Sequence, residues 1–120
     1  MPVLGADLSN ILSGIIALGA QGGEQLFLPK IHAVLCEMKG HNKMLAGLWF
    51  SITGSVCYSR DIENAVRELA CQGVLTIEKG SVAVVRDVLT LKKRLRKMLP
   101  GRQYRKILAA SRKFYKRLQG

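Results

Sequence analysis

Lysines and arginines crowd the C-terminal end of this 120-residue chain, whose net charge is +11. Residues 86–120 contain thirteen basic residues and a single acidic one, Asp87, whereas residues 1–85 contain six basic and seven acidic residues. Solvated helix faces normally mix both signs, so a run of like charges without glutamate repels itself. Phosphate offsets this repulsion and releases counterions, so these residues indicate binding to a polyanion.

The basic residues that we expect to contact nucleic acid fall in two groups. The larger group lies in the basic tail, which we define as residues 86–120, and consists of Lys92, Lys93, Arg94, Arg96, Lys97, Arg102, Arg105, Lys106, Arg112, Lys113, Lys116 and Arg117. The smaller group precedes the tail and consists of Arg60, Arg67 and Lys79. A membrane-surface helix would need a broad, bulky apolar face, and the apolar stripes of the tail are narrow. We therefore predict nucleic acid as the partner, DNA in preference to RNA, and no membrane.

Three aromatic residues lie among the basic residues of the tail. Tyr104, Phe114 and Tyr115 could stack on unpaired bases, as in proteins that bind single strands or RNA. Their spacing along the chain instead favours packing between helices. The single tryptophan, Trp49, is expected in the core.

Residue types that could hold a metal or perform catalysis occur without a supporting motif. His32 and Cys36 are four residues apart and His41 follows, so the three could ligate zinc. A fourth ligand is not evident, and such a pair is more typical of packing, so we predict no metal and no cofactor. The chain has neither a glycine-rich phosphate loop followed by Lys-Ser/Thr nor a paired-carboxylate motif. We therefore expect a binding protein and not an enzyme.

The three cysteines, Cys36, Cys57 and Cys71, do not form a recognisable disulfide framework, because their number is odd and their spacing does not recur. This pattern indicates reduced thiols in an intracellular, cytoplasmic protein. The apolar run of residues 8–18 is too short to span a bilayer, and no Lys or Arg precedes it, so we expect no targeting segment.

Hydrophobic periodicity predicts the elements that must position these residues. Helices are expected from Leu8, from Pro29 to Gly40, and from an N-cap at Ser59 to Gly73. Residues 44–50 are expected to run from a short helix into an extended piece, and residues 51–57 to form a turn or short strand. A β-hairpin is expected at residues 74–85 with Gly80 in its turn, and two tail helices are separated by Pro100-Gly101. The chain divides into an N-terminal helix and linker (1–28), a central domain (29–85) and the tail (86–120).

The central domain resembles the winged-helix family of prokaryotic type, over residues 29–85. Phe50-Ser51-Ile52-Thr53-Gly54-Ser55-Val56-Cys57-Tyr58-Ser59 is similar to the entry into the third helix of that family, and Leu69-Ala70-Cys71-Gln72-Gly73-Val74-Leu75 is similar to its exit into the wing. The resemblance implies a mostly α fold with a small β-hairpin wing (α+β), a winged helix-turn-helix followed by the basic two-helix tail. It makes residues 59–72 the equivalent of the recognition helix and places Lys79 at the tip of the wing.

The charges on the exposed face of that helix differ from those expected of a helix that reads DNA strongly. This face carries Arg60 and Arg67, but also Asp61, Glu63 and Glu68. A helix that enters a groove usually brings net positive charge to the phosphates. We therefore expect a small DNA-binding winged-helix protein, in the manner of a transcriptional regulator, whose affinity comes from the tail. The alternative is a protein–protein interaction module, or an accessory subunit of a nucleic-acid machine, that the tail anchors to RNA or DNA.

Two apolar stripes exceed what one small core needs and point to self-association. They are Leu8, Ile11, Leu12 and Ile15 near the N-terminus, and Val88, Leu91, Leu95 and Met98 in the tail. Repulsion between tails favours the N-terminal stripe as the contact of a homodimer. Because the charge divides between Val85 and Arg86, we also expect that removing everything after Val85 would reduce nucleic-acid affinity by orders of magnitude and leave a folded core.

Overall fold

The computed structural model describes residues 3–20, 25–54, 56–84 and 88–119. Within these ranges the chain is a compact α+β domain with five α-helices, a three-stranded antiparallel sheet of order β1-β5-β4 and a two-stranded hairpin β2-β3. The predicted boundary between Val85 and Arg86 lies outside the described residues. The elements are α1 (Val3–Ala17), β1 (Gln25–Phe27), α2 (Leu28–Lys39), the 3-10 helix η1 (Lys43–Leu45), β2 (Ser51–Thr53), β3 (Val56–Tyr58), α3 (Arg60–Cys71), β4 (Leu75–Glu78), β5 (Ser81–Val84), α4 (Val88–Met98) and α5 (Gly101–Gln119).

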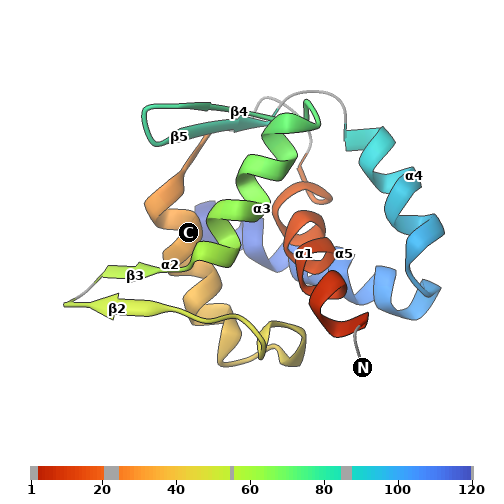
Figure 1. The fold of residues 1–120 in the computed structure, drawn as a ribbon, viewed down its shortest axis with the longest axis horizontal. Coiled ribbons are helices and arrows are strands. Elements are labelled where there is room, and N and C mark those ends of the chain that lie inside the picture. The colour runs from red at the N-terminus through yellow and green to blue at the C-terminus, as the bar shows by residue number, and fades with distance from the viewer. Residues whose placement is uncertain (1–2, 21–24, 55, 85–87, 120) are drawn as a thin grey trace.

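Helix α1 is the centre of the molecule. It packs against α3, α4 and α5; in Figure 1 it lies beside α3, with α5 behind it. Leu12, Ile15 and Ile16 are fully buried, because a helix surrounded by other helices is apolar on most of its sides. The helix predicted from Leu8 is thereby confirmed, and its apolar stripe is the core of the domain.

Hydrogen bonds from α5 complete the C-terminal end of α1. The buried Ser111 hydroxyl donates to the Ile15 carbonyl at 2.7 Å and accepts the Gly19 N–H at 2.7 Å. The Tyr115 hydroxyl donates to the Ile16 carbonyl. These bonds satisfy backbone groups that the end of a helix leaves without partners. At Gly14 the two helices approach so closely that a side chain would collide with Ile107.

The basic tail is built into the same core and is not an appendage. Leu95, Ile107 and Phe114 are fully buried in one cluster with the apolar residues of α1. The apolar stripes that indicated self-association therefore cover each other within one chain, apart from Met98, which is 56% exposed. A homodimer stays a prediction with no surface assigned to it. Residues 1–85 alone would expose the side of α1 that α5 covers, so we now expect that fragment to be much less stable than the whole chain.

Strands β4 and β5 form the predicted hairpin, which we call the wing. Thr76 pairs with Ala83, and the tight turn places Lys79 and Gly80 at φ 50° and 83°. Glycine adopts this left-handed region without strain, which explains its place in the turn. Strand β1 adds a third strand by pairing with β5, with Leu26 opposite Val82. Three residues are too few to show a period, so the sequence did not predict it.

Helix α3 begins where predicted, but its start is held differently from expectation. Ser59 occupies the N-cap position with an extended backbone, yet its side chain makes no capping bond. Its hydroxyl is buried and has no hydrogen-bond partner in the part of the chain that is described. The Ser59 N–H instead donates to Nδ1 of His32 at 3.1 Å, and the His32 ring stacks on Tyr58 with centroids 5.1 Å apart. His32 thus joins α2 to the start of α3.

The β2-β3 hairpin, and Trp49 just before it, expose apolar side chains. Trp49, Ile52 and Val56 are 72%, 65% and 61% exposed. The expectation that Trp49 lies in the core is therefore wrong, because the chain leaves the core after Leu48 and turns outward into the hairpin. The hairpin is attached to the rest of the molecule through β3, which packs against α2.

The His32 bond predicts a pH-dependent stability. Burial lowers the pKa of His32 below its ordinary value of 6.5, and the nearby Glu63 carboxylate opposes this effect more weakly. The unfolded chain therefore binds more protons than the folded one just below pH 6.5, so stability falls as pH drops through that window. We expect the urea midpoint to decrease from pH 7.5 to 5.5, and to decrease less in His32→Gln. An equal decrease in both proteins would assign the effect to other groups.

Candidate nucleic-acid interface

Seven basic side chains occupy one face of α5. At 100° per residue they fall within an arc of about 140°, opposite the buried side chains that face α1. All seven are exposed. We call this surface the α5 basic face; its members are Arg102, Arg105, Lys106, Arg112, Lys113, Lys116 and Arg117.

Two hollows border this face where α5 meets α2 and η1. The larger, of about 830 Å³, is lined by Lys30 and Glu37 of α2 together with Lys113, Lys116 and Arg117 of α5. The smaller, of about 290 Å³, is lined in part by Lys43, Lys106 and Lys113. The structure thus adds Lys30 and Lys43 to the candidate site. Sequence reasoning missed both, because only the packing of α2 and η1 beside α5 brings them to the tail.

Three of the predicted arginines of the tail have partners within the protein. Arg117 forms an ion pair with Glu37, and Arg94 donates to the side chain of Gln72 at 2.9 Å. The guanidinium of Arg96 lies 5.4 Å from the centroid of the Tyr104 ring. Among the described residues, the other six members of the α5 basic face make no ion pair. Those six are therefore the charges best placed to meet phosphate.

The remaining predicted residues of α4 lie on the surface. Lys93 and Lys97 are exposed, and Lys92 is half-buried. These α4 residues belong to the basic tail, as α5 does, and add basic surface beyond the α5 basic face.

The aromatic residues of the tail fill the core. Tyr104, Phe114 and Tyr115 are 6%, 0% and 7% exposed, and the rings of Phe114 and Tyr115 meet edge to face at 5.2 Å. The packing interpretation is confirmed, and these rings have no free face for a base. The α5 basic face offers charge without an aromatic platform, which suits contact with a phosphate backbone.

The structure does not bring the predicted residues of α3 to this face. Arg60 and Arg67 lie on α3, which is separated from α5 by α1 (Figure 1). Arg67 forms an ion pair with Glu63 at 2.9 Å, and Glu63 also accepts a hydrogen bond from the Tyr58 hydroxyl. The Tyr58 bond and the charge of Arg67 lower the pKa of Glu63, which keeps this carboxylate ionised. Lys79 is exposed at the tip of the wing.

The residues considered for zinc have other surroundings. His32 Nδ1 is taken by the Ser59 N–H, and the Cys36 thiol donates to Cys57 Sγ at 3.0 Å. This hydrogen bond, followed by burial, raises the pKa of Cys36 and favours its thiol form. Across the described ranges no three His, Cys, Asp or Glu side chains gather to hold a metal. All three cysteines carry free thiols.

Among the described helices, none is both long enough and apolar enough to cross a bilayer. Comparison with protein-family models, with curated proteins and with solved structures finds no match to this chain.

Proposed function

We propose that this protein binds nucleic acid through the α5 basic face, as a binding protein and not as an enzyme. The observation that carries the proposal is the gathering of seven exposed cations on one side of a single helix, with Glu37 as the acidic residue beside them. The positive charges of such a surface repel one another and are attracted to the closely spaced phosphates of a nucleic acid. Phosphate contacts carry no base information, so binding is sequence-tolerant.

Duplex DNA fits this surface better than single strands. The helix has 19 residues and is about 28 Å long, a length over which a duplex presents many phosphates. A single-strand site would combine cations with exposed aromatic rings, and the rings of the tail are buried. The contact that we propose is therefore with the duplex backbone.

The proposed fold family is the winged helix. Its support is the chain order of α2, α3, β4 and β5, with the wing pairing to β1 at the sheet. The β2-β3 hairpin is an addition between α2 and α3. In this proposal α3 occupies the place of a recognition helix but contributes little affinity, since Arg67 is paired with Glu63. The α5 basic face provides the attraction, and Arg60 and Lys79 are secondary contacts.

A second candidate function is supported by the exposed apolar residues of the hairpin. Trp49, Ile52 and Val56 lie close together in the chain and are each more than 60% exposed. Ile52 pairs with Cys57 and Val56 with Thr53, so the two side chains lie on opposite faces of the hairpin. Large apolar surface exposed in this way is typical of protein-binding sites. In this alternative a protein partner covers the hairpin while the tail anchors the pair to RNA or DNA.

A gel mobility-shift experiment tests the main proposal. Duplex DNA of unrelated sequences, single-stranded DNA and structured RNA are compared at 50 and 200 mM salt. We expect every duplex to shift at the lower salt with similar affinity, and to bind about a thousandfold more weakly at the higher salt. If none of the three nucleic acids shifted at 50 mM salt, the proposal would be contradicted.

A further inference from the structure

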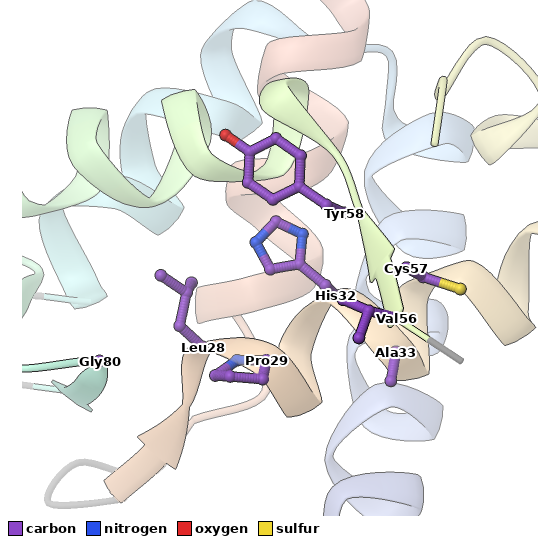
Figure 2. A pocket seen from close by; sticks show the side chains of 8 residues that line it. All are labelled: Leu28, Pro29, His32, Ala33, Val56, Cys57, Tyr58 and Gly80. Atoms are coloured by element: carbon purple, nitrogen blue, oxygen red, sulfur yellow. The ribbon is translucent and has the colours of Figure 1, made fainter. Parts of the chain in front are cut away.

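A second surface feature lies on α2 and β3, apart from the α5 basic face. A hollow of about 370 Å³ opens between the start of α2, strand β3 and the turn of the wing. Its lining is almost entirely apolar and is drawn in Figure 2. The lining residues are Leu28, Pro29, His32, Ala33, Val56, Cys57, Tyr58 and Gly80. This volume falls at the small end of the range of ligand pockets in proteins.

His32 and Tyr58 are polar side chains that line this hollow; the Tyr58 hydroxyl donates to Glu63, and the protonation of His32 follows from its own hydrogen bond. The His32 side chain is 4% exposed. Because Nδ1 accepts the Ser59 N–H, the proton of the neutral ring sits on Nε2. In Figure 2 the ring lies beneath Tyr58, and its second nitrogen is on the side away from β3, above Leu28. This N–H has no hydrogen-bond partner among the described residues.

Ser59 Oγ is the one side-chain atom of the described residues that is both sealed from solvent and without a partner, so His32 Nε2, which also has none, is open to the surroundings of the buried ring. An acceptor in the hollow would form a hydrogen bond with it in place of water. We propose that the hollow binds a small, neutral, apolar molecule that carries one hydrogen-bond acceptor, such as a carbonyl, placed against His32 Nε2. The apolar walls provide the affinity, and the single donor fixes the orientation of the ligand.

The charges around the ring select a neutral acceptor over an anionic one. The Glu63 carboxylate is close enough to His32 to act on its pKa, and it is kept ionised by Tyr58 and Arg67. A ligand carboxylate would be repelled by Glu63, whereas a carbonyl would not. Burial also favours the neutral form of His32, so the ring offers a hydrogen bond without a counter-charge.

Two isosteric probes test this site directly. Acetophenone and α-methylstyrene have nearly the same shape, because a =CH₂ group in the second takes the place of the carbonyl oxygen of the first. Each is titrated into ¹⁵N-labelled protein, and the amide shifts of Leu28, His32, Ala33 and residues 56–58 are followed by NMR. We expect both probes to shift these amides, with acetophenone binding about 3- to 10-fold more tightly because of one net hydrogen bond.

Two variants separate the donor from the walls. His32→Phe keeps an aromatic ring but removes the donor, so the two probes should bind it equally. Ala33→Phe fills the hollow from an exposed position of α2 and should abolish the shifts from both probes. Equal affinity of the unmodified protein for the two probes, shifts confined to other residues, or no binding of either probe at millimolar concentration would each overturn the proposal.

Discussion

Replacing Lys106 and Lys113 together with glutamine lowers the affinity for duplex DNA about 50-fold at 0.1 M salt. Each phosphate contact contributes about 0.9 to the slope of log affinity on log salt, so losing two contacts removes nearly two decades at this concentration. Both side chains are exposed members of the α5 basic face, and Lys113 borders both hollows beside α2 and η1. Fluorescence anisotropy with a labelled duplex measures the change, and a thermal melt checks that the fold is intact.

The matched control removes two charges from the other side of α1. Arg60→Gln with Arg67→Gln changes the net charge by the same amount, but on α3, where Arg67 is already paired with Glu63. We expect this variant to lose less than about fivefold in affinity. A loss as large as that of the α5 variant would show that α3 and the wing carry the binding, and would contradict our assignment of the interface.

Phe114→Ala destabilises the whole domain, by about 3–5 kcal/mol. Phe114 is fully buried and packs edge to face on Tyr115, so truncation leaves a cavity between α5 and the rest of the core. A loss of this size is a large share of the 5–15 kcal/mol by which domains are typically stable. Urea unfolding followed by circular dichroism measures the change in the free energy of unfolding.

The neighbouring Lys113→Ala is the control for this experiment. Its side chain is exposed, so the free energy of unfolding should change by less than about 0.5 kcal/mol. If Phe114→Ala were as stable as Lys113→Ala, the tail would not share the core with α1. The interpretation of the tail as a separable appendage would then be correct.

The sequence predicted the longer elements because their periods extend over several turns. The apolar spacing in α3 and in the tail matches the buried residues Ile62, Leu69 and Leu95, and Pro100-Gly101 marks the break between α4 and α5. The split of charge between residues 1–85 and the tail also predicted where the basic surface lies. These local patterns do not show which apolar stripes pack together. For that reason the sequence did not reveal that the tail helices pack against α1, and it suggested a core that folds without the tail.

The misses have physical causes. Strand β1 has three residues, which do not establish an alternation, and for residues 51–57 the sequence predicted a turn or short strand without showing that two short strands pair there. Trp49 was expected inside because large apolar residues are usually buried, but the chain turns outward after the buried Leu48 and leaves Trp49 exposed. Glycine disfavours a helix, so Gly14 argues locally against α1, although its lack of a side chain is what lets Ile107 of α5 approach. Ile107 is 93 positions from Gly14 in the sequence, so a local pattern cannot show this contact.

The salt dependence of duplex binding tests the central claim most directly. Six members of the α5 basic face make no ion pair among the described residues, and if all six meet phosphates the slope of log affinity on log salt is about −5. The Lys106→Gln, Lys113→Gln variant should give a slope shallower by about 2. Anisotropy titrations between 50 and 200 mM salt provide both values. A slope near zero for the unmodified protein, or the same slope for the variant, would contradict binding through this face.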